Sequence, residues 1–322
     1  MSSDLLYLST ADVQNLNISP RGAREAVLAA FRDNAAARNR SLPKTSLDIG
    51  PGRVFQSMCS ASEASGIATV KWIAMAPVEG KQGTYGINGL ICVSDYKTGV
   101  PVAVLDGNFI TLIRTAAMSA AAAVYLAPEA PTTIGLVGCG SQALSHLDAF
   151  VDLFPSLRRI YLLSRSVSSA ERVAIAACQK GLTPIISNDP DTLLSQSEIV
   201  VSMVPRSPGS KSPLDARLMP ASSFASSVDA GWTWRPETFT AFDRLVTDSL
   251  EQTTSPMGES GHPVEAVRFQ DDLGHVVSGS LGQRAPTRAL FCFRGFAIAD
   301  LALAELAIRK ARASGIGTLL AR

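Results

Sequence analysis

Cysteine and histidine are scarce in this sequence, and their scarcity excludes several kinds of protein. The 322 residues include five cysteines, which are scattered and form no C-x-x-C pair, so neither a disulfide framework nor a zinc site is indicated. The three histidines, His146, His262 and His275, never stand at the spacing of a helical ligand pair. We therefore expect reduced thiols and no metal centre.

An excess of charge and a long apolar run are also missing. Lys and Arg number 29 and Asp and Glu 28, so the overall charge marks no nucleic-acid binder. No uninterrupted apolar run approaches the roughly 20 residues of a membrane span, while a 46% hydrophobic content excludes intrinsic disorder. The first residues show no secretory signal. These features predict a soluble, cytoplasmic protein with neither nucleic acid nor membrane as a partner.

The first part of the chain predicts a helix, an antiparallel sheet and a second helix. Residues 23–38 have helical periodicity, and residues 54–105 alternate β-branched runs with turn signals. Lys97-Thr98-Gly99 indicates a hairpin turn. An Ala-rich helix over 111–126 ends before Pro128. The expected strands are residues 70–75, 89–94 and 100–105.

From residue 127 onward the pattern changes to alternating strands and helices. The expected strands are residues 134–137, 159–163, 199–204, 224–228 and 245–246. This alternation predicts an α/β fold with a doubly wound parallel sheet. A last helix over 297–313 lies beyond that unit and is expected to return to the first domain. We thus expect residues 1–126 with 297–322 to form one α+β domain and residues 127–296 a Rossmann domain.

The strongest motif lies between the strand 134–137 and the helix after it. It reads Gly138-Cys139-Gly140-Ser141-Gln142-Ala143, which has the form G-x-G-x-x-A. Gly138 permits the tight turn, Gly140 lets a pyrophosphate approach the backbone, and Ala143 allows close helix packing. The strand before the motif and the βαβ pattern after it predict a dinucleotide site; a turn that binds nothing is the alternative.

The second strand of this unit is followed by Ser164-Arg165-Ser166, where an NAD site normally has an acidic residue. Arginine can pair a phosphate bidentately, so the sequence favours NADPH over NADH, with NADH as a possibility. A solvated surface arginine is the alternative, and Arg172 either supplements the phosphate site or faces water. The strand beginning at residue 199 adds expected cofactor contacts at its end, namely Met203, Val204 and Pro205.

Four charged residues elsewhere are candidates for binding or chemistry. Lys71 stands inside an apolar strand, so it is either exposed at an edge or turned inward and paired, commonly with a substrate carboxylate. Arg114 at the start of the Ala-rich helix, with Lys44, predicts a carboxylate clamp. Asp229 follows a strand at the carboxyl edge of the sheet, where ligands bind, although a turn or capping role is the alternative.

Several motif segments occur together along the chain. They are Ser94-Asp95-x-x-Thr98-Gly99-x-Pro101, Asp106-Gly107-x-x-Ile110-Thr111-x-x-Arg114-Thr115-Ala116-Ala117 and the glycine motif at 138–143. Two further segments, at residues 272–279 and 295–302, continue the set toward the C-terminus. Together these segments resemble the ornithine cyclodeaminase and μ-crystallin family, and the resemblance spans nearly all the chain.

The resemblance implies a homodimer whose first domain supplies the subunit contact and the substrate pocket, beside a Rossmann domain. It implies that Lys71 and Arg114 hold a substrate carboxylate and that Thr115, with Arg114, lies near the cofactor. Lys44 stands where the family pattern usually has arginine, and Met58-Cys59 replaces a frequent Met-Pro beside the pocket. Other expected pocket side chains are Trp72, Trp232 and Trp234, for which core packing is the alternative.

The resemblance also bears on the reaction. Cyclodeaminases have a catalytic aspartate just beyond a glycine; if Gly231 matches that glycine, the place of the acid falls near Thr233. The hypothesis is therefore a reductase that converts Δ1-pyrroline-2-carboxylate to L-proline or Δ1-piperideine-2-carboxylate to L-pipecolate with NAD(P)H. The proton source is either Lys71 or a water held by Asp229. Alternatives are ornithine cyclodeaminase, an alanine dehydrogenase-like enzyme, and a non-catalytic NADPH-binding protein like μ-crystallin.

Overall fold

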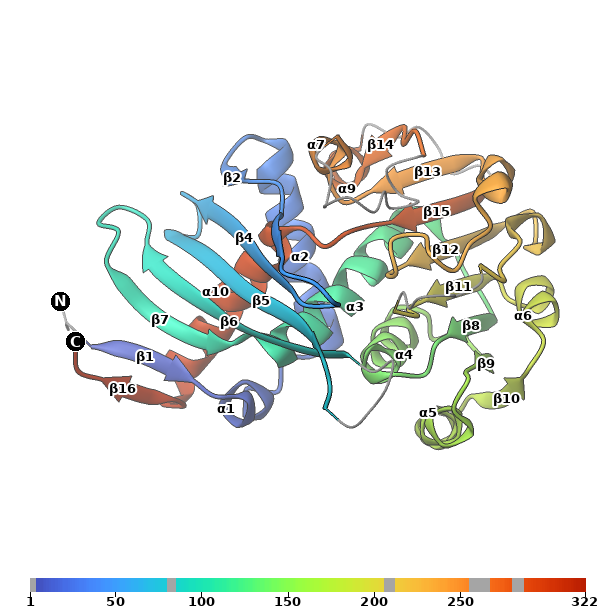
Figure 1. The fold of residues 1–322 in the computed structure, drawn as a ribbon, viewed down its shortest axis with the longest axis horizontal. Coiled ribbons are helices and arrows are strands. Elements are labelled where there is room, and N and C mark those ends of the chain that lie inside the picture. Colours follow the sequence, from blue (N-terminus) through green and yellow to red (C-terminus); the bar gives the residue numbers. More distant parts are fainter. Residues whose placement is uncertain (1–3, 80–84, 206–211, 255–266, 280–286) are drawn as a thin grey trace. The chain divides into compact units, whose positions relative to one another are not determined.

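The computed structural model describes residues 4–79, 85–205, 212–254, 267–279 and 287–322. These residues form two compact units (Figure 1). Unit 1 contains the described residues of 1–114 and 295–322, and unit 2 contains those of 115–254 and 261–294. The chain therefore leaves the first unit and returns to it at the C-terminus.

Unit 1 is built on an eight-stranded mixed sheet in the order β16-β1-β7-β6-β5-β4-β2, with β3 paired to β4. Only the pairing of β1 with β7 is parallel among these strands. The elements are β1 (Leu5–Leu8), α1 (Thr10–Asn15), α2 (Pro20–Ala35), β2 (Asn39–Ser41), β3 (Thr45–Asp48), β4 (Val54–Ser62), β5 (Ile67–Pro77), β6 (Tyr85–Asp95), β7 (Pro101–Asp106), the start of α3 (Gly107–Leu126), α10 (Ala297–Ser314) and β16 (Thr318–Leu320).

The long hairpins of unit 1 follow from local turn chemistry. Between β6 and β7 the carboxylate of Asp95 accepts hydrogen bonds from the backbone N–H and the hydroxyl of Thr98, at 2.8 and 2.7 Å. Gly99 completes the turn at φ +71°, a conformation that glycine adopts without strain. The expected turn at Lys97-Thr98-Gly99 is thus present, and it brings two antiparallel strands together.

One face of this sheet is covered by α10 and α2, and the other is open in the described chain. Helix α10 packs against α2, β4 and β5. Along β5 the side chains alternate, since Thr69 and Lys71 are 6% and 0% exposed whereas Val70 and Trp72 are 37% and 49% exposed. Lys71 therefore lies on the covered face. Trp72 lies on the opposite face, so the expectation that it lines the same pocket as Lys71 is wrong.

Unit 2 is built on an eight-stranded sheet in the order β10-β9-β8-β11-β12-β15-β13-β14, and every pairing in it is parallel. The elements are β8 (Thr133–Val137), α4 (Ser141–Leu153), β9 (Arg159–Leu163), α5 (Val167–Gln179), β10 (Thr183–Ser187), α6 (Pro190–Gln196), β11 (Ile199–Ser202), η1 (Ala216–Leu218), β12 (Ser223–Ser227), η2 (Pro236–Ala241), β13 (Arg244–Thr247), α7 (Leu250–Thr253), β14 (Asp271–Asp272), α9 (Leu273–Val277) and β15 (Arg288–Cys292).

The strand order of unit 2 reverses between β8 and β11. The chain runs from β8 outward to β9 and β10, then crosses to β11 and continues to β12 on the other side. Ligands of doubly wound sheets bind at the carboxyl ends of the strands where the order reverses. The G-x-G-x-x-A motif follows β8 and so lies at this point, and the expected Rossmann architecture is confirmed.

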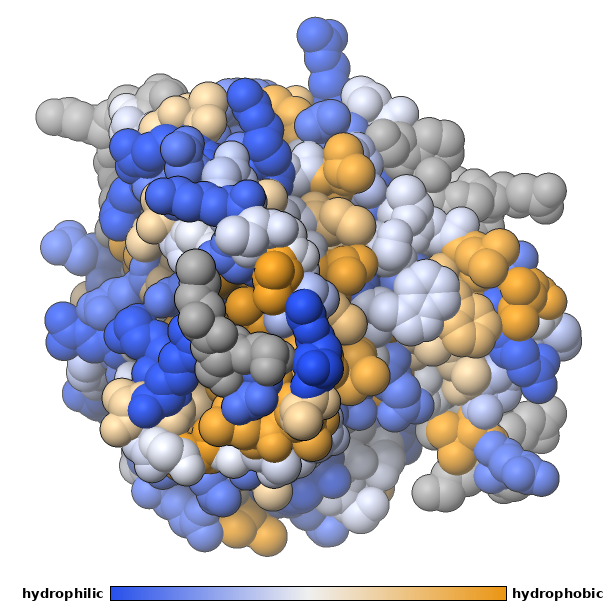
Figure 2. All heavy atoms as spheres, turned by 90° about the vertical axis from the view of Figure 1, so that its left-hand side faces the viewer, coloured by the Kyte–Doolittle hydropathy of each residue, from blue (hydrophilic) through white to orange (hydrophobic). Residues whose placement is uncertain are grey.

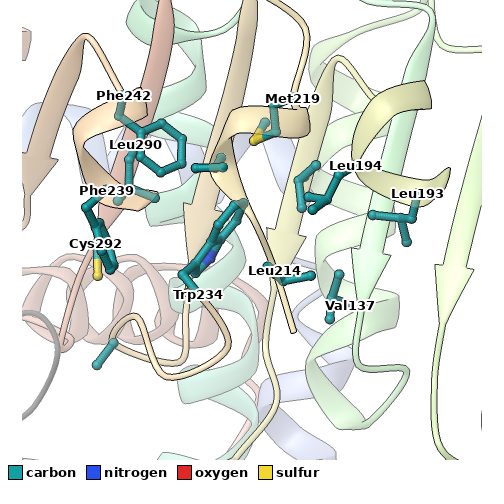
Figure 3. Close-up of a cluster of buried hydrophobic side chains, with 14 of the residues drawn as sticks. Val137, Leu193, Leu194, Leu214, Met219, Trp234, Phe239, Phe242, Leu290 and Cys292 are labelled. Carbon is teal, nitrogen blue, oxygen red and sulfur yellow. The ribbon is translucent and has the colours of Figure 1, made fainter. Parts of the chain in front are cut away.

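An aromatic and aliphatic core packs beside the sheet of unit 2 (Figure 3). Trp234 is fully buried in it, and its ring meets that of Phe242 edge-on at 5.5 Å between centroids. Its indole N–H donates to the hydroxyl of Ser202 at 3.0 Å. Trp234 is therefore a core residue, and of its two expected roles the structure supports packing rather than lining a pocket.

Helix α3 is long and apolar enough, by length and composition, to cross a membrane. However, 67% of its most apolar 18-residue stretch is buried inside the fold, as in the core helix of a soluble protein. Helix α3 is buried because its first part belongs to the fold of unit 1 and its later part to that of unit 2. Unit 1 ends at Arg114 and unit 2 begins at Thr115, so the boundary lies within the helix, whereas the sequence analysis placed it after residue 126.

The later half of α3 belongs to unit 2 because small residues let another helix approach it. Ala116 and Ala120 pack against Ala149 and Leu153 of α4. Close approach of two helices needs short side chains at the contact, which explains the Ala-rich composition of this segment. The sequence pattern alone shows an apolar helix but does not show which unit covers it.

Candidate functional site

Three charged side chains meet in the interior of unit 1. The Lys71 ammonium lies 2.7 Å from Asp300 Oδ1, and Arg114 Nε lies 3.2 Å from the same oxygen. The three side chains are 0%, 8% and 2% exposed for Lys71, Arg114 and Asp300. They come from β5, α3 and α10, so the fold of unit 1 builds this cluster from distant parts of the chain. We call Lys71, Arg114 and Asp300 the charged cluster.

Burial governs the acid–base behaviour of Lys71. Loss of water lowers its pKa to about 7, and the positive charge of Arg114 acts in the same direction. Asp300 works against both, through its charge and its hydrogen bond, while Lys44 adds a smaller lowering effect. A lysine with its pKa near neutrality can hold an anion in one protonation state and exchange a proton in the other.

Asp300 is the functional candidate that sequence reasoning did not single out. It lies within a segment that carries the family resemblance, but nothing in that segment indicates its partner. A carboxylate inside an otherwise apolar helix is the same signal that marked Lys71 inside an apolar strand. Buried charges are paired, so these two exceptions to the hydrophobic pattern could have been matched.

Neighbouring residues shape the space around the charged cluster. Met58 of β4 is directly opposite Lys71 in the strand register and is 2% exposed. Gly295 stands at φ +90°, where any other residue is strained, and a Cβ there would lie 2.9 Å from Arg114 Nη1 and displace the guanidinium. Lys71 and Arg114 share the one carboxylate of Asp300, and Lys44 acts on Lys71 electrostatically. This excess of positive charge suits a ligand carboxylate.

The glycine motif of unit 2 forms a tight loop from β8 into α4. The Gly138 N–H donates to the carbonyl of Leu163 at 2.8 Å, which ties the loop to β9. Gly138 has φ +97°, and a Cβ on it would lie 3.1 Å from the carbonyl oxygen of Met203. Glycine is therefore required there by conformation and by space. Burial raises the pKa of the Cys139 thiol to about 11, so this residue contributes backbone rather than a reactive thiolate.

Gly140 leaves the N-terminus of α4 open to a ligand. It is the N-cap residue, it makes no side-chain capping hydrogen bond, and among the described residues no atom beyond its chain neighbours lies within 4 Å of the place of its missing Cβ. The amides of Ser141, Gln142 and Ala143 follow it at the positive end of the helix dipole. This helix start has no side-chain cap, and it lies where the strand order of the sheet reverses. Such a position fits the pyrophosphate of a dinucleotide.

The residues after β9 differ in their exposure and in their hydrogen bonds. Arg165 is exposed, which leaves its guanidinium available to a phosphate. The Ser166 hydroxyl accepts from the Ser169 N–H at 3.2 Å and so caps α5. Arg172 donates to the carbonyl of Cys139 at 3.1 Å. Arg172 therefore neither only faces water nor is shown to meet a phosphate; it braces the glycine loop.

Asp229 of unit 2 is held by hydroxyl groups. Its carboxylate accepts from Ser227 at 2.5 Å, from Thr233 at 2.6 Å and from Ser202 at 3.1 Å. Burial raises the pKa of Asp229, and these hydrogen bonds oppose that rise. The next residue, Ala230, has φ +53° in the turn. This arrangement supports the turn-stabilising interpretation of Asp229.

Comparison with known proteins identifies the family of the chain. Residues 4–315 match the ornithine cyclodeaminase/mu-crystallin family, which is nearly the whole chain. The chain belongs to this family. The charged cluster, the glycine motif and Asp229 all lie within the matched residues.

Members of the ornithine cyclodeaminase/mu-crystallin family that reduce imines are among the relatives. A Δ1-pyrroline-2-carboxylate reductase of Bacillus cereus is 23% identical, over 97% of this chain and 98% of its own. Iminosuccinate reductase of Paracoccus denitrificans is 26% identical, over 97% of this chain and 98% of its own. The solved structure of Thermococcus litoralis Δ1-pyrroline-2-carboxylate reductase, in complex with NADH and L-proline, superposes with a TM-score of 0.88 at 25% identity, over 98% and 99% of the two chains.

Metal ligands are not assembled in the part of this family member that the structure describes. No group of three His, Cys, Asp or Glu side chains comes together there as a ligand set. His146 is buried, His275 lies beside Asp271 and Asp272 in unit 2, and His262 falls outside the described residues.

Proposed function

We propose that this protein is an NAD(P)H-dependent reductase of cyclic imino acids. Its substrates are Δ1-pyrroline-2-carboxylate, which gives L-proline, and Δ1-piperideine-2-carboxylate, which gives L-pipecolate. The observation that carries the proposal is the charged cluster: a fully buried lysine and a buried arginine share one carboxylate and leave positive charge for another. The Rossmann sheet with its open glycine loop supports the nucleotide part.

Substrate binding follows from the cations of unit 1. The guanidinium of Arg114 is a planar donor that matches a carboxylate, and Lys71 adds a point charge from the neighbouring strand. Asp300 keeps both in place before the substrate arrives. Lys44 and Met58 complete the expected binding residues, with Met58 as an apolar wall beside Lys71.

The proposed cofactor-binding loop belongs to unit 2. Residues 138–143 would hold the pyrophosphate, and the reduced nicotinamide of the bound cofactor supplies the hydride that the imine carbon accepts. Ser164, Arg165 and Ser166 would contact the 2′-phosphate of NADPH. Arg114 and Thr115 of α3 and the residues that follow β11 are proposed to contact the cofactor as well; the latter are Met203, Val204 and Pro205.

Lys71 is the proposed proton donor. A protonated imine accepts hydride more readily than a neutral one, and binding of the substrate carboxylate favours the charged form of Lys71. Asp229 is already an acceptor for three hydroxyl groups, which favours a structural role for it. The reaction consumes one proton and one hydride and forms the C–H and N–H bonds of the cyclic amino acid.

Cyclodeaminase chemistry has less support from these residues. If Gly231 matches the family glycine, the place of the catalytic acid falls near Thr233, whose hydroxyl donates to Asp229. The Gly231 N–H donates to the Ser227 hydroxyl at 2.9 Å, which fixes the turn in this conformation. No carboxylate therefore stands at that position to transfer protons during deamination.

A substrate panel tests the proposed function. Purified protein is mixed with NADPH or NADH and with Δ1-pyrroline-2-carboxylate, Δ1-piperideine-2-carboxylate, pyruvate plus ammonia, or ornithine, and cofactor absorbance and released ammonia are followed. We expect loss of NAD(P)H absorbance with the cyclic imines. Ammonia and proline formed from ornithine would instead support a cyclodeaminase, and cofactor binding without any turnover would support a binding protein.

Arg165 is expected to set the preference for NADPH. Replacing it by Ala removes the guanidinium proposed to pair the 2′-phosphate, so KM for NADPH should rise about tenfold or more while KM for NADH stays nearly constant. Steady-state kinetics with both cofactors measure this. Arg159→Ala, which removes an exposed arginine at the other end of β9, is the matched control. Equal effects on the two cofactors would remove the case for phosphate recognition.

We further propose that the protein is a cytoplasmic homodimer joined through the open face of the unit 1 sheet. Trp72 and Leu90, which pair across β5 and β6, are 49% and 47% exposed, and Phe55 stacks on Trp72 at 5.8 Å between ring centroids. Figure 2 shows apolar side chains gathered in patches between hydrophilic ones on the side that is at the left of Figure 1. Contiguous exposed apolar surface marks interfaces.

Trp72→Lys is expected to convert the dimer to a monomer, because a charge replaces an aromatic side chain at the centre of this face. Sedimentation velocity measures the mass. Trp72→Phe, which keeps an aromatic ring, should remain a dimer. A monomeric wild-type protein, or a dimer that survives Trp72→Lys, would contradict the proposed interface.

A further inference from the structure

A chain of buried hydrogen bonds connects β12, α3 and the first turn of α4 in unit 2. The Ser226 hydroxyl donates to Ser119 Oγ at 2.8 Å, and Ser119 Oγ lies 3.1 Å from His146 Nε2. On the other side of the ring, His146 Nδ1 lies 2.8 Å from the carbonyl oxygen of Gln142. Ser119, His146 and Ser226 are each 0% exposed. None of these contacts is used by the proposed reaction.

The chemistry of the partners fixes which atom donates at each step. A carbonyl oxygen only accepts, so His146 Nδ1 carries a hydrogen and donates to Gln142. Burial lowers the pKa of His146 to about 4, so the ring is neutral at pH 7 and Nε2 is an acceptor. The Ser119 hydroxyl therefore donates to Nε2 and accepts from Ser226. Every hydrogen bond in the chain thus has a single direction, which makes it a rigid connection.

The first turn of α4 lacks the support that neighbouring helices have. Helix α5 is capped by the side chain of Ser166 and α6 by that of Asp189, whereas Gly140 before α4 has no side chain to cap with. A side-chain cap on α4 would occupy the amides that a pyrophosphate needs. The turn must therefore be held from a side that leaves those amides open, and the ring of His146 contacts it at a carbonyl.

We propose that His146 is a positioning residue for the dinucleotide loop, which it anchors through the carbonyl of Gln142 to Ser119 of α3 and Ser226 of β12. The inference rests on the proposed function, because it takes residues 138–143 as the cofactor loop. It adds that cofactor affinity depends on a buried side chain outside that loop. By fixing the peptide plane after Gln142, His146 preorganises the amides that meet the pyrophosphate.

Two substitutions test the two hydrogen bonds of the His146 ring separately. The side-chain amide of His146→Asn can place an N–H near the position of Nδ1 and keep the bond to Gln142, while it is too short to reach Ser119. His146→Gln can reach Ser119 but has no N–H near the position of Nδ1. We expect His146→Gln to raise the dissociation constant and KM for NADPH about 3- to 10-fold, the equivalent of one hydrogen bond, with kcat nearly constant. His146→Asn should restore most of the affinity.

Cofactor binding is measured by NADPH fluorescence titration, without substrate, beside thermal unfolding of each variant. Phe239→Leu is the matched control, since it perturbs the aromatic core of unit 2 far along the chain from the loop and should lower stability without changing affinity. If His146→Gln does not fold, His146→Ala removes both hydrogen bonds of the ring and serves in its place, with the same direction expected. Unchanged NADPH affinity in His146→Gln, or equal losses in the Gln and Asn variants, would overturn the role of His146. A wild-type protein that does not bind NADPH or NADH would overturn the proposed function itself.

Discussion

Lys71→Met is expected to lower kcat/KM for Δ1-pyrroline-2-carboxylate by about 10²- to 10³-fold, in the range found when one member of a buried charge pair is removed. Methionine keeps the length of the side chain and removes the ammonium that is proposed to hold the carboxylate and donate the proton. The hydrogen-bond partners of Lys71 are Asp300 and Thr111 of unit 1, neither of which is a proposed cofactor contact. The dissociation constant for NADPH should therefore stay close to that of the wild-type protein.

The pH dependence of carboxylate binding by the wild-type protein also tests the role of Lys71. Since its pKa in the free protein is lowered to about 7, the ammonium is lost as the pH rises through that value, and carboxylate binding should weaken above it. Inhibition by pyrrole-2-carboxylate, which has no imine nitrogen to titrate, isolates this effect from protonation of the substrate. Lys71→Arg stays charged and should lose the alkaline decline in inhibitor affinity.

Lys97→Met is the matched control, because Lys97 is an exposed lysine of unit 1 in the β6–β7 turn. Its steady-state kinetics should match those of the wild-type protein. Turnover by Lys71→Met at nearly the wild-type rate would show that the charged cluster does not bind the substrate.

Asp300→Asn is expected to lower the free energy of unfolding by about 3 kcal/mol at pH 6, because the change leaves Lys71 and Arg114 buried without their shared carboxylate. Urea denaturation followed by circular dichroism measures the loss. Glu305→Gln on the same helix is the control: Glu305 pairs with Arg309 at the surface, and such pairs contribute about 0–1 kcal/mol.

The destabilisation by Asp300→Asn should shrink as the pH rises from 6 to about 9. The folded-state pKa of Lys71 lies below its ordinary value of 10.5. The free energy of unfolding is therefore reduced at every pH at which Lys71 is protonated in the unfolded chain. Asp300 raises that folded-state pKa, so its loss reduces the free energy of unfolding further below about pH 7. Above that range Lys71 is neutral in both folded proteins, and this part of the difference vanishes. A loss no larger than that of Glu305→Gln would contradict the role of Asp300 as the counterion.

Much of unit 2 could be predicted because its signals are local. The strand expected at residues 159–163 matches β9, and the strand expected at 224–228 is displaced by one residue from β12 (Ser223–Ser227). The glycine motif lies between a strand and a helix, as its chemistry requires. β15 (Arg288–Cys292) was not predicted although it lies inside the sheet, because a five-residue apolar run does not distinguish a buried strand from other buried segments.

Contacts between distant residues could not be predicted in the same way. The edge of the unit 1 sheet pairs Leu5 with Leu320, and no periodicity near either terminus indicates that pairing. The Lys71–Asp300 ion pair joins residues 229 positions apart. The sequence predicted that Lys71, if turned inward, would be paired, and the fold supplies a protein carboxylate as that partner. Likewise, the hydroxyl shell of Asp229 depends on β11 and on the turn after β12, which meet only in the folded sheet.

The most direct test follows the transferred hydride. NADPH carrying deuterium at the transferable C4 position is incubated with Δ1-pyrroline-2-carboxylate and the protein, and the product is analysed by mass spectrometry and chiral chromatography. The account predicts L-proline with deuterium at the α-carbon, formed in proportion to the NADPH consumed and without release of ammonia. Oxidation of NADPH without labelled proline, or the absence of any reaction with either cyclic imine while NADPH remains bound, would contradict it.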